Sequence, residues 1–309
     1  ERQEDTVYIR WSELDAVRAA LRKEQPTAKD KIYYLTPELR VPLHFYTDER
    51  LPEPTEEDDR IGLLLKENMF REFAPAYLYI YQPDGSVRPK VRDFHRFRPD
   101  YIKYNSTRKP EYAIKTILYT DDQGKRFAVK AGTTPAANAH IESLSEKAEA
   151  IAKTNPQLSV LRAVEFSHAL GSFQFLSFQR YPFVEGPSVS EILGGMIQDG
   201  VAPIKELAET VDLVLGVKDG MVQPANFDCQ FDNVIMCDGQ PTLIDCEWVF
   251  DEAVDVRFLQ YRLLYYWYME YRTQLAYDDA YAFLRNFGFS KQESDAFAER
   301  EESFQDEIH

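Results

Sequence analysis

Hydrophobic and polar residues follow different periods in the two parts of the chain. Between residues 101 and 130, apolar residues fall in short extended runs, and a polar turn at 120–124 separates two of them. From about residue 185, apolar residues recur instead every three or four positions, as in 204–217. The pattern predicts a small antiparallel sheet followed by a mainly helical unit.

Individual elements are expected at definite positions. Three strands are predicted at 101–104, 112–119 and 126–130, and a helix follows in which Ile141, Leu144, Ala148 and Ile151 form one face. Further strands are predicted at 158–166, 173–178, 234–237 and 242–244, and further helices at 188–196, 204–217 and 258–271. The order is therefore three strands, a helix and two strands, followed by the helical part.

Residues 1–99 have the pattern of an N-terminal extension. An amphipathic helix is expected at 11–24, and residues 48–59 combine two prolines with an acidic run, which is typical of an exposed linker. The turn residues at 83–85 predict a β-hairpin with strands at 76–80 and 87–91. We therefore divide the chain into an extension, 1–99, a sheet-containing lobe, 100–184, and a helical lobe, 185–309.

Composition narrows the classes of function. Of the 309 residues 44% are apolar and 28% charged, as in a globular protein, and no apolar run is long enough to span a membrane. The net charge of −16 gives no reason to expect nucleic-acid binding. Three cysteines without a C-x-x-C pair indicate a reducing, cytoplasmic location. A first residue other than Met is compatible with a longer parent protein that carries additional domains.

Three polar residues stand at the spacing that phosphate chemistry needs. Asp228 precedes Asn233 by five residues, so both lie on one loop, and two short strands joined by a turn then lead to Asp245. Across that hairpin, Asp245 can meet Asn233. Amide and carboxylate oxygens are hard ligands that suit Mg²⁺, and a separate carboxylate can orient an attacking hydroxyl.

These motifs resemble the protein-kinase-like superfamily, whose catalytic loop runs D-x-x-x-x-N and whose metal-binding Asp follows two short strands. The run 244–248, Ile-Asp-Cys-Glu-Trp, is most similar to the small-molecule branch, the choline kinase and aminoglycoside phosphotransferase families. It is also similar to kinase-like domains of bacterial surface-polysaccharide biosynthesis proteins. The resemblance implies a two-lobed α+β fold with an antiparallel-sheet N-lobe and a mainly helical C-lobe.

The resemblance also implies a cofactor and roles for site residues. ATP would bind between the lobes with Mg²⁺ held by Asn233 and Asp245, and Asp228 would be the catalytic carboxylate. Lys130, in the run Phe-Ala-Val-Lys, matches the strand lysine that contacts the α- and β-phosphates. Glu146, sixteen residues later on the next helix, is the chosen ion-pair partner of that lysine.

Other positions extend this resemblance or depart from it. Glu142 and Glu149 are alternative partners for the lysine, and Phe183 and Val184 fall where the family places the adenine-binding hinge. No glycine-rich loop separates the first two strands, because residues 105–111 read NSTRKPE, in which Arg108 or Lys109 would supply charge for phosphate.

Two further departures bear on activity. Residues 226 and 227 are Asn and Phe where the family usually has a histidine before the catalytic Asp. Glu247 replaces the glycine of Asp-Phe-Gly, which excludes a conventional protein-kinase switch.

The sequence leads to three hypotheses about function. The first is an ATP-dependent kinase that transfers phosphate to a hydroxyl of a small molecule or sugar, because no activation loop separates Asp245 from the following helix. The second, prompted by the missing glycine-rich loop, is an inactive pseudokinase that serves as a nucleotide-binding or interaction module. The third is a carbohydrate-binding module within residues 60–100, where aromatic residues surround the predicted hairpin.

Overall fold

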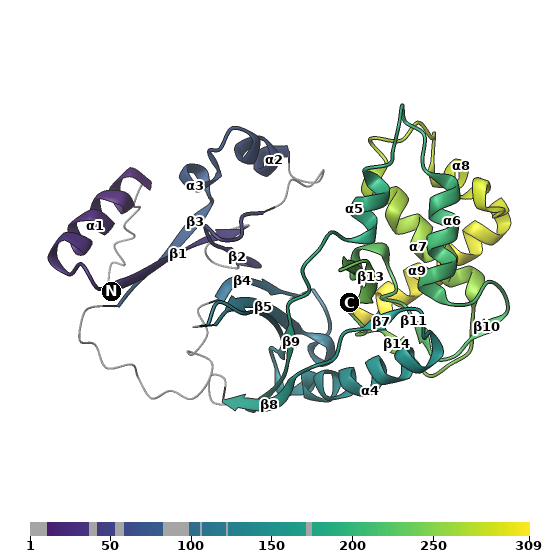
Figure 1. Cartoon of the computed structure of the whole chain (residues 1–309), viewed down its shortest axis with the longest axis horizontal. Coiled ribbons are helices and arrows are strands. Elements are labelled where there is room, and N and C mark those ends of the chain that lie inside the picture. Colours follow the sequence, from purple (N-terminus) through teal and green to yellow (C-terminus); the bar gives the residue numbers. More distant parts are fainter. Residues whose placement is uncertain are drawn as a thin grey trace, which may run out of the picture. The chain divides into compact units, whose positions relative to one another are not determined.

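The computed structural model describes residues 11–36, 42–52, 59–82, 99–105, 107–121, 123–170 and 175–309. The chain forms two compact units, each built from separate stretches of sequence (Figure 1). Unit 1 comprises residues 1–106, 114–130 and 169–173. Unit 2 comprises residues 107–113, 131–168 and 174–309.

Unit 1 contains an antiparallel sheet. Its strands are β1 (Lys29–Thr36), β2 (His44–Tyr46), β3 (Ala76–Gln82), β4 (Pro99–Tyr104), β5 (Ile114–Thr120) and β6 (Arg126–Gly132), the last two residues of which belong to unit 2. They are hydrogen-bonded in the order β3-β1-β2-β4-β5-β6, and the pairs from β3 to β5 are antiparallel. The three strands predicted between residues 101 and 130 are confirmed, and β1 and β2 add strands that the sequence pattern did not predict.

Helices pack on one face of this sheet. They are α1 (Trp11–Glu24), which matches the predicted helix, α2 (Asp59–Lys66) and the single turn α3 (Phe70–Phe73). Leu14 of α1 and Phe70 of α3 share an apolar cluster with Ile32 and Tyr34 of β1. Strand β3 pairs with β1, whereas the second strand of the predicted hairpin, 87–91, and residues 53–58 of the predicted linker lie outside the described residues.

Unit 2 begins with the short segment 107–113, which contains the 3₁₀ turn η1 (Pro110–Tyr112). It continues with η2 (Pro135–Ala137), α4 (Asn138–Thr154), β7 (Ser159–Val160), β8 (Glu165–Leu170), the last two residues of which belong to unit 1, and β9 (Phe175–Pro182). Strand β8 neighbours β9 in the sheet order. The four apolar residues predicted to form one face of α4 are all buried. The helical periodicity therefore identified the core-facing side of α4 correctly.

The rest of unit 2 is mainly helical. Helices α5 (Val189–Gly194), α6 (Ile204–Leu215), α8 (Ala280–Leu284) and α9 (Lys291–Ile308) gather around α7 (Val256–Tyr271), as Figure 1 shows. Capping boxes fix the starts of α5 and α9, where Ser188 pairs with Glu191 and Ser290 pairs with Glu293. Two further 3₁₀ turns are η3 (Phe231–Asn233) and η4 (Arg285–Phe287).

Short strands lie between α6 and α7. Strands β10 (Met221–Val222) and β15 (Val254–Asp255) pair, as do β11 (Ala225–Asn226) and β14 (Val249–Phe250). The hairpin of β12 (Val234–Cys237) and β13 (Gln240–Leu243) is antiparallel, and β7 joins β13 in parallel. The predicted hairpin is confirmed: its first strand matches at both ends, and its second strand begins two residues earlier and ends one residue earlier than predicted.

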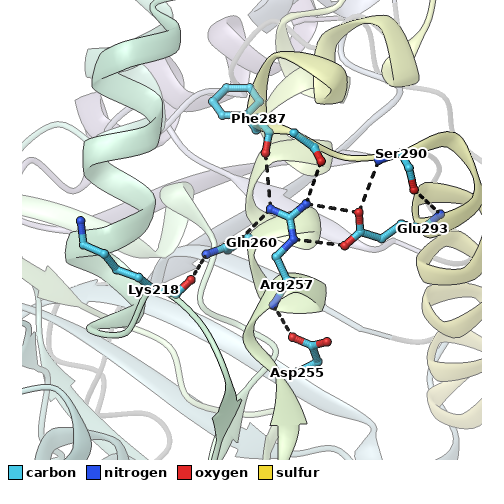
Figure 2. Close-up of polar contacts among 8 residues, drawn as sticks. Lys218, Asp255, Arg257, Gln260, Phe287, Ser290 and Glu293 are labelled. Carbon is cyan, nitrogen blue, oxygen red and sulfur yellow. Dashed lines mark hydrogen bonds and ion pairs between the residues drawn. The ribbon is translucent and has the colours of Figure 1, made fainter.

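Arg257 ties the start of α7 to the start of α9 (Figure 2). Its Nε donates to Glu293 Oε1 at 3.1 Å and its Nη2 donates to Glu293 Oε2 at 3.2 Å. The guanidinium also donates to the carbonyl oxygens of Phe287 and Gly288, and it lies over the Phe289 ring. The planar guanidinium group presents two N–H donors side by side, which suits this bidentate contact with a carboxylate.

The predicted fold class, α+β with an antiparallel sheet followed by a helical part, is confirmed. Among the residues that the structure describes, no helix combines the length and the apolar character needed to cross a bilayer.

Candidate active site

Asp228 and Asn233 lie on one loop of unit 2, residues 227–233, which we call the Asp228 loop. The amide of Asp228 donates to Asn226 Oδ1 at 2.9 Å, and Asn233 Nδ2 donates to the carbonyl oxygen of Asp228 at 2.9 Å. Buried Phe227 and Phe231 anchor the loop in the core. Because the amide nitrogen of Asn233 donates to backbone, Oδ1 is the atom that presents lone pairs to a cation.

The β12–β13 hairpin brings Asp245 to this loop. Val234 pairs with Leu243, and the amide of Ile244 donates to the carbonyl oxygen of Asn233 at 2.8 Å. Asp245 directly follows that contact and, like Asn233, is half-buried. The structure thus brings Asn233 and Asp245 to the same end of the hairpin, while their role as metal ligands stays a prediction.

The backbone after Asp245 connects the two carboxylates. The amide of Glu247 donates to Asp245 Oδ1 at 3.2 Å, and the amide of Trp248 donates to Asp228 Oδ2 at 2.7 Å. Hydrogen bonds from backbone amides to an ionised carboxylate are stronger than those between neutral groups. Asp228, Asn233 and Asp245 therefore form one connected group within unit 2.

Arg108, a predicted phosphate contact, binds a carboxylate in this structure. Its Nη1 donates to Glu247 Oε2 at 2.6 Å, and its guanidinium lies over the Trp248 ring. The two charged side chains are only 17% and 4% exposed. The next residue, Lys109, donates through its amide to the carbonyl oxygen of Ile308 at 3.0 Å. The segment 107–113 is thus attached to the end of α9, and phosphate binding by Arg108 stays a prediction.

Lys147 of α4 is a cation of this site that the sequence pattern did not single out. Its Nζ donates to the carbonyl oxygen of Glu247 at 2.6 Å. Burial lowers the pKa of Lys147, and the nearby carboxylates of Asp228 and Glu247 partly offset that effect. Lys147 lies three residues after Leu144 and four before Ile151, so the helical period places it beside the buried face. This position beside the buried face is the sequence feature by which Lys147 could have been identified.

Arg262 of α7 holds the Asp228 loop from the core side. Its Nη2 donates to the carbonyl oxygen of Phe227 at 3.0 Å, and its guanidinium lies over the Phe227 ring. It forms an ion pair with Glu301 of α9, and Tyr266 Oη donates to Glu301 Oε1 at 2.5 Å. Burial lowers the pKa of Arg262 to about 10, so the guanidinium is still charged at neutral pH.

The predicted lysine and its candidate partners are distributed over both units. Lys130 lies on β6 in unit 1 and is half-buried. Glu146 and Glu149 are exposed on α4, and Glu146 forms no hydrogen bond or ion pair with the described residues of unit 2. Glu142 Oε1 accepts a hydrogen bond from Ser177 Oγ at 2.9 Å. An ion pair between Lys130 and one of these glutamates stays a prediction.

The predicted hinge follows β9. Phe183 and Val184 are half-buried there, and their contact with adenine stays a prediction. Gly186, with a φ of 140°, then passes so close to β12 that a Cβ at this position would lie 2.2 Å from the carbonyl oxygen of Met236. Only glycine fits this approach, which fixes the path of the chain from β9 into α5.

The donor set at the end of the hairpin fits a hard divalent cation. Asn233 and Asp245 supply an amide oxygen and a carboxylate, which are ligands that Mg²⁺ accepts. Over the ranges that the structure describes, no group of three or more His, Cys, Asp or Glu residues is placed to hold a metal ion. Mg²⁺ is commonly held by one or two protein ligands together with substrate phosphate oxygens and water.

Two cysteines flank these residues. Cys229 and Cys246 are both buried, and burial raises the pKa of the Cys229 thiol to about 12. The protonated thiol of Cys229 lacks the thiolate that nucleophilic attack or metal binding requires, which fits a packing role.

Comparisons with known proteins give weak structural similarity to kinases. No protein-family model and no curated protein sequence matches the chain. The PknI kinase domain of Mycobacterium tuberculosis, a C20A mutant, is 14% identical with a TM-score of 0.34, over 63% of this chain and 81% of that one. Amicoumacin kinase hAmiN, in complex with AMP-PNP, Ca²⁺ and Ami, is 13% identical with a TM-score of 0.33, over 56% and 68%. At sequence identities and TM-scores this low, the similarity supports no assignment of function. The function has to be inferred from the geometry of unit 2.

Proposed function

We propose that the chain is an ATP- and Mg²⁺-dependent phosphotransferase that phosphorylates a hydroxyl group of a small molecule or sugar. The observation that supports this function is the connected group of Asp228, Asn233 and Asp245, joined by the hydrogen bonds from Asn233 Nδ2 and the Trp248 amide to Asp228. Phosphoryl transfer depends on positioning and on stabilising charge. This group offers one carboxylate for the acceptor and two hard oxygen ligands for a metal.

In the proposed reaction, the acceptor hydroxyl oxygen forms a bond to the γ-phosphorus of ATP, the bond to the β–γ bridging oxygen breaks, and ADP leaves. Asp228 orients the hydroxyl and takes its proton. Asn233 and Asp245 hold Mg²⁺, which neutralises phosphate charge when bound. Lys130 is the proposed contact for the α- and β-phosphates.

The acceptor is proposed from the sequence motif. The residues after Asp245 read Cys-Glu-Trp, as in the small-molecule branch, so small alcohols and sugars are the acceptors to test first. Sugars used in surface-polysaccharide synthesis belong in that set, because the sequence also resembles kinase-like domains of such proteins.

Asp228→Asn tests the proposal. Asparagine keeps an oxygen that can accept from the Trp248 amide, but it cannot take a proton, so the fold should persist while transfer falls by about 10²- to 10⁴-fold. The measurement is transfer of radiolabelled γ-phosphate from ATP to the acceptor set and to water. Asp219→Asn, the same chemical change at an exposed position, is the matched control. Retained transfer in Asp228→Asn would contradict the proposal.

A second candidate function is an inactive module that binds nucleotide or a protein partner. One observation favours it: Arg108, expected to contact phosphate, is paired with Glu247. Unfolding temperatures with and without Mg²⁺-ATP distinguish the candidates, because saturating ligand at about 100 times its Kd stabilises the folded state by roughly 2.7 kcal/mol. Nucleotide binding without phosphate transfer, or no binding at all, would favour this second candidate.

A further inference from the structure

One peptide group lies between Lys147 and Asp228. Its carbonyl oxygen, from Glu247, accepts from Lys147 Nζ at 2.6 Å. Its N–H, from Trp248, donates to Asp228 Oδ2 at 2.7 Å. An ammonium and a carboxylate thus bind the two ends of a single planar dipole.

This arrangement strengthens both contacts. A cation on the carbonyl oxygen polarises the peptide and makes its N–H a better donor, which is the cooperativity expected of hydrogen bonds in series. The peptide is buried on both sides, because Glu247 and Trp248 are 3% and 6% exposed. Water therefore competes little for either hydrogen bond, and the low local dielectric increases their strength.

Other contacts hold the same peptide in place. The amide of Glu247 donates to Asp245 Oδ1, and Arg108 binds the Glu247 carboxylate. Neither contact uses the carbonyl oxygen of Glu247, which accepts the hydrogen bond from Lys147 Nζ. Loss of the ammonium would therefore leave a buried carbonyl oxygen without that donor, which is costly.

We infer that Lys147 is a positioning residue that fixes the carboxylate of Asp228 through the Glu247–Trp248 peptide. This inference rests on the proposed function, since it assigns Lys147 to the carboxylate that would orient the acceptor hydroxyl. Because the N–H of this peptide holds Asp228 Oδ2 in place, it also fixes the orientation of the whole Asp228 carboxylate. Placement of a base matters because a displacement of about 1 Å can cost roughly 10²-fold in rate.

The first test needs no catalysis. Hydrogen exchange of the Trp248 amide is followed by NMR in the isotopically labelled full chain. Lys147→Met, similar in length but uncharged, should speed exchange of this amide roughly tenfold. Amides of α7 should keep their protection, which separates a local effect from global unfolding. Lys147→Arg should retain most of the Trp248 protection, and Lys153→Met, an exposed change on the same helix, should leave it unchanged.

The second test uses phosphate transfer to an acceptor or to water. Lys147→Met should lower turnover roughly tenfold or more without weakening Mg²⁺-ATP binding, since the side chain is proposed to act on Asp228 and not on nucleotide. Lys147→Arg should restore part of the rate. In an Asp228→Asn background, Lys147→Met should cause no further loss, because residues that act as a unit are not additive.

The outcomes separate this inference from the proposed function. Unchanged Trp248 exchange in Lys147→Met would overturn the inference, and so would a full additional rate loss in the Asp228→Asn background. Absence of phosphate transfer in the wild-type chain would overturn the proposed function. Faster Trp248 exchange would still support the peptide link in that case, because exchange is measured without substrate.

Discussion

Arg262 of α7 and Glu301 of α9 form an ion pair whose side chains are only 4% and 9% exposed. Removing one member of a buried pair leaves the other charge without compensation, at a cost of about 3–5 kcal/mol. We expect Arg262→Met to lower the free energy of unfolding by about this amount in urea titrations. Arg285→Met, an exposed change in the same unit, should cost less than about 0.5 kcal/mol.

The double variant sharpens this prediction. Arg262→Met combined with Glu301→Met removes both buried charges, so it should cost less than Arg262→Met alone. A double variant that loses the sum of the two single losses would show that the two side chains act independently. It would then contradict the view that their pairing connects α9 to the carbonyl oxygen of Phe227.

Two glycines in the β12 region should respond differently to alanine. Gly186→Ala places a Cβ 2.2 Å from the carbonyl oxygen of Met236, whereas a Cβ at Gly239 meets nothing within 4 Å. Both have positive φ. We expect Gly239→Ala to cost about 1 kcal/mol from backbone strain alone, and Gly186→Ala to cost at least about 2 kcal/mol more. Equal losses in thermal unfolding would contradict the close approach of Gly186 to β12.

The contact between Arg257 and Glu293 should make stability depend on pH. The hydrogen bond from Arg257 lowers the pKa of Glu293 below its ordinary value of 4.5. A carboxyl whose pKa is lower in the folded state stabilises that state above the ordinary pKa, and this contribution disappears as pH falls through the folded-state pKa. The difference in unfolding free energy between wild type and Glu293→Gln should therefore be largest above about pH 4.5.

Exposed Glu302, on the same helix, provides the control for that titration. Glu302→Gln should follow the wild-type pH dependence within error. A Glu293→Gln variant whose loss of stability is the same at pH 3 and pH 7 would exclude the ion pair as its cause.

Asp245 should determine how metal affects nucleotide binding. In the proposed site it is a ligand of Mg²⁺, so Asp245→Asn should abolish the part of the ATP-induced rise in Tm that requires the metal. Asp238→Asn changes another aspartate of the same hairpin, at its exposed turn, and should retain the full rise. If Asp245→Asn is stabilised by Mg²⁺-ATP as much as wild type, the metal ligands lie elsewhere.

The sequence predicted elements that carry a local pattern. The apolar positions of α4 recur at helical spacing, and all four lie in the core. Strand β1 was missed because Ile32, Tyr33, Tyr34 and Leu35 are consecutive and all buried, so the alternation expected of a half-exposed strand is absent. A run buried on both faces has no period of two from which to identify a strand.

The same distinction applies to the candidate site. Asp228, Asn233 and Asp245 fall within eighteen residues, so one loop and one hairpin suffice to bring them together. Lys147 lies 100 residues from Glu247, and Arg108 lies 139 residues from it. Contacts between positions so far apart in the sequence produce no local spacing pattern. Only the tertiary structure shows that these residues are paired.

Unit 2 cannot be cut from the protein as one continuous piece, because its three stretches of sequence are separated by residues of unit 1. A fragment that starts at residue 185, the sequence-based boundary of the helical lobe, would contain Asp228 and Asp245 but neither Lys147 nor Arg108. Glu247 would then have lost the donors to both its carbonyl oxygen and its carboxylate. A truncated or chimeric version of this protein therefore has to retain residues 107–113 and α4 together with the helical lobe.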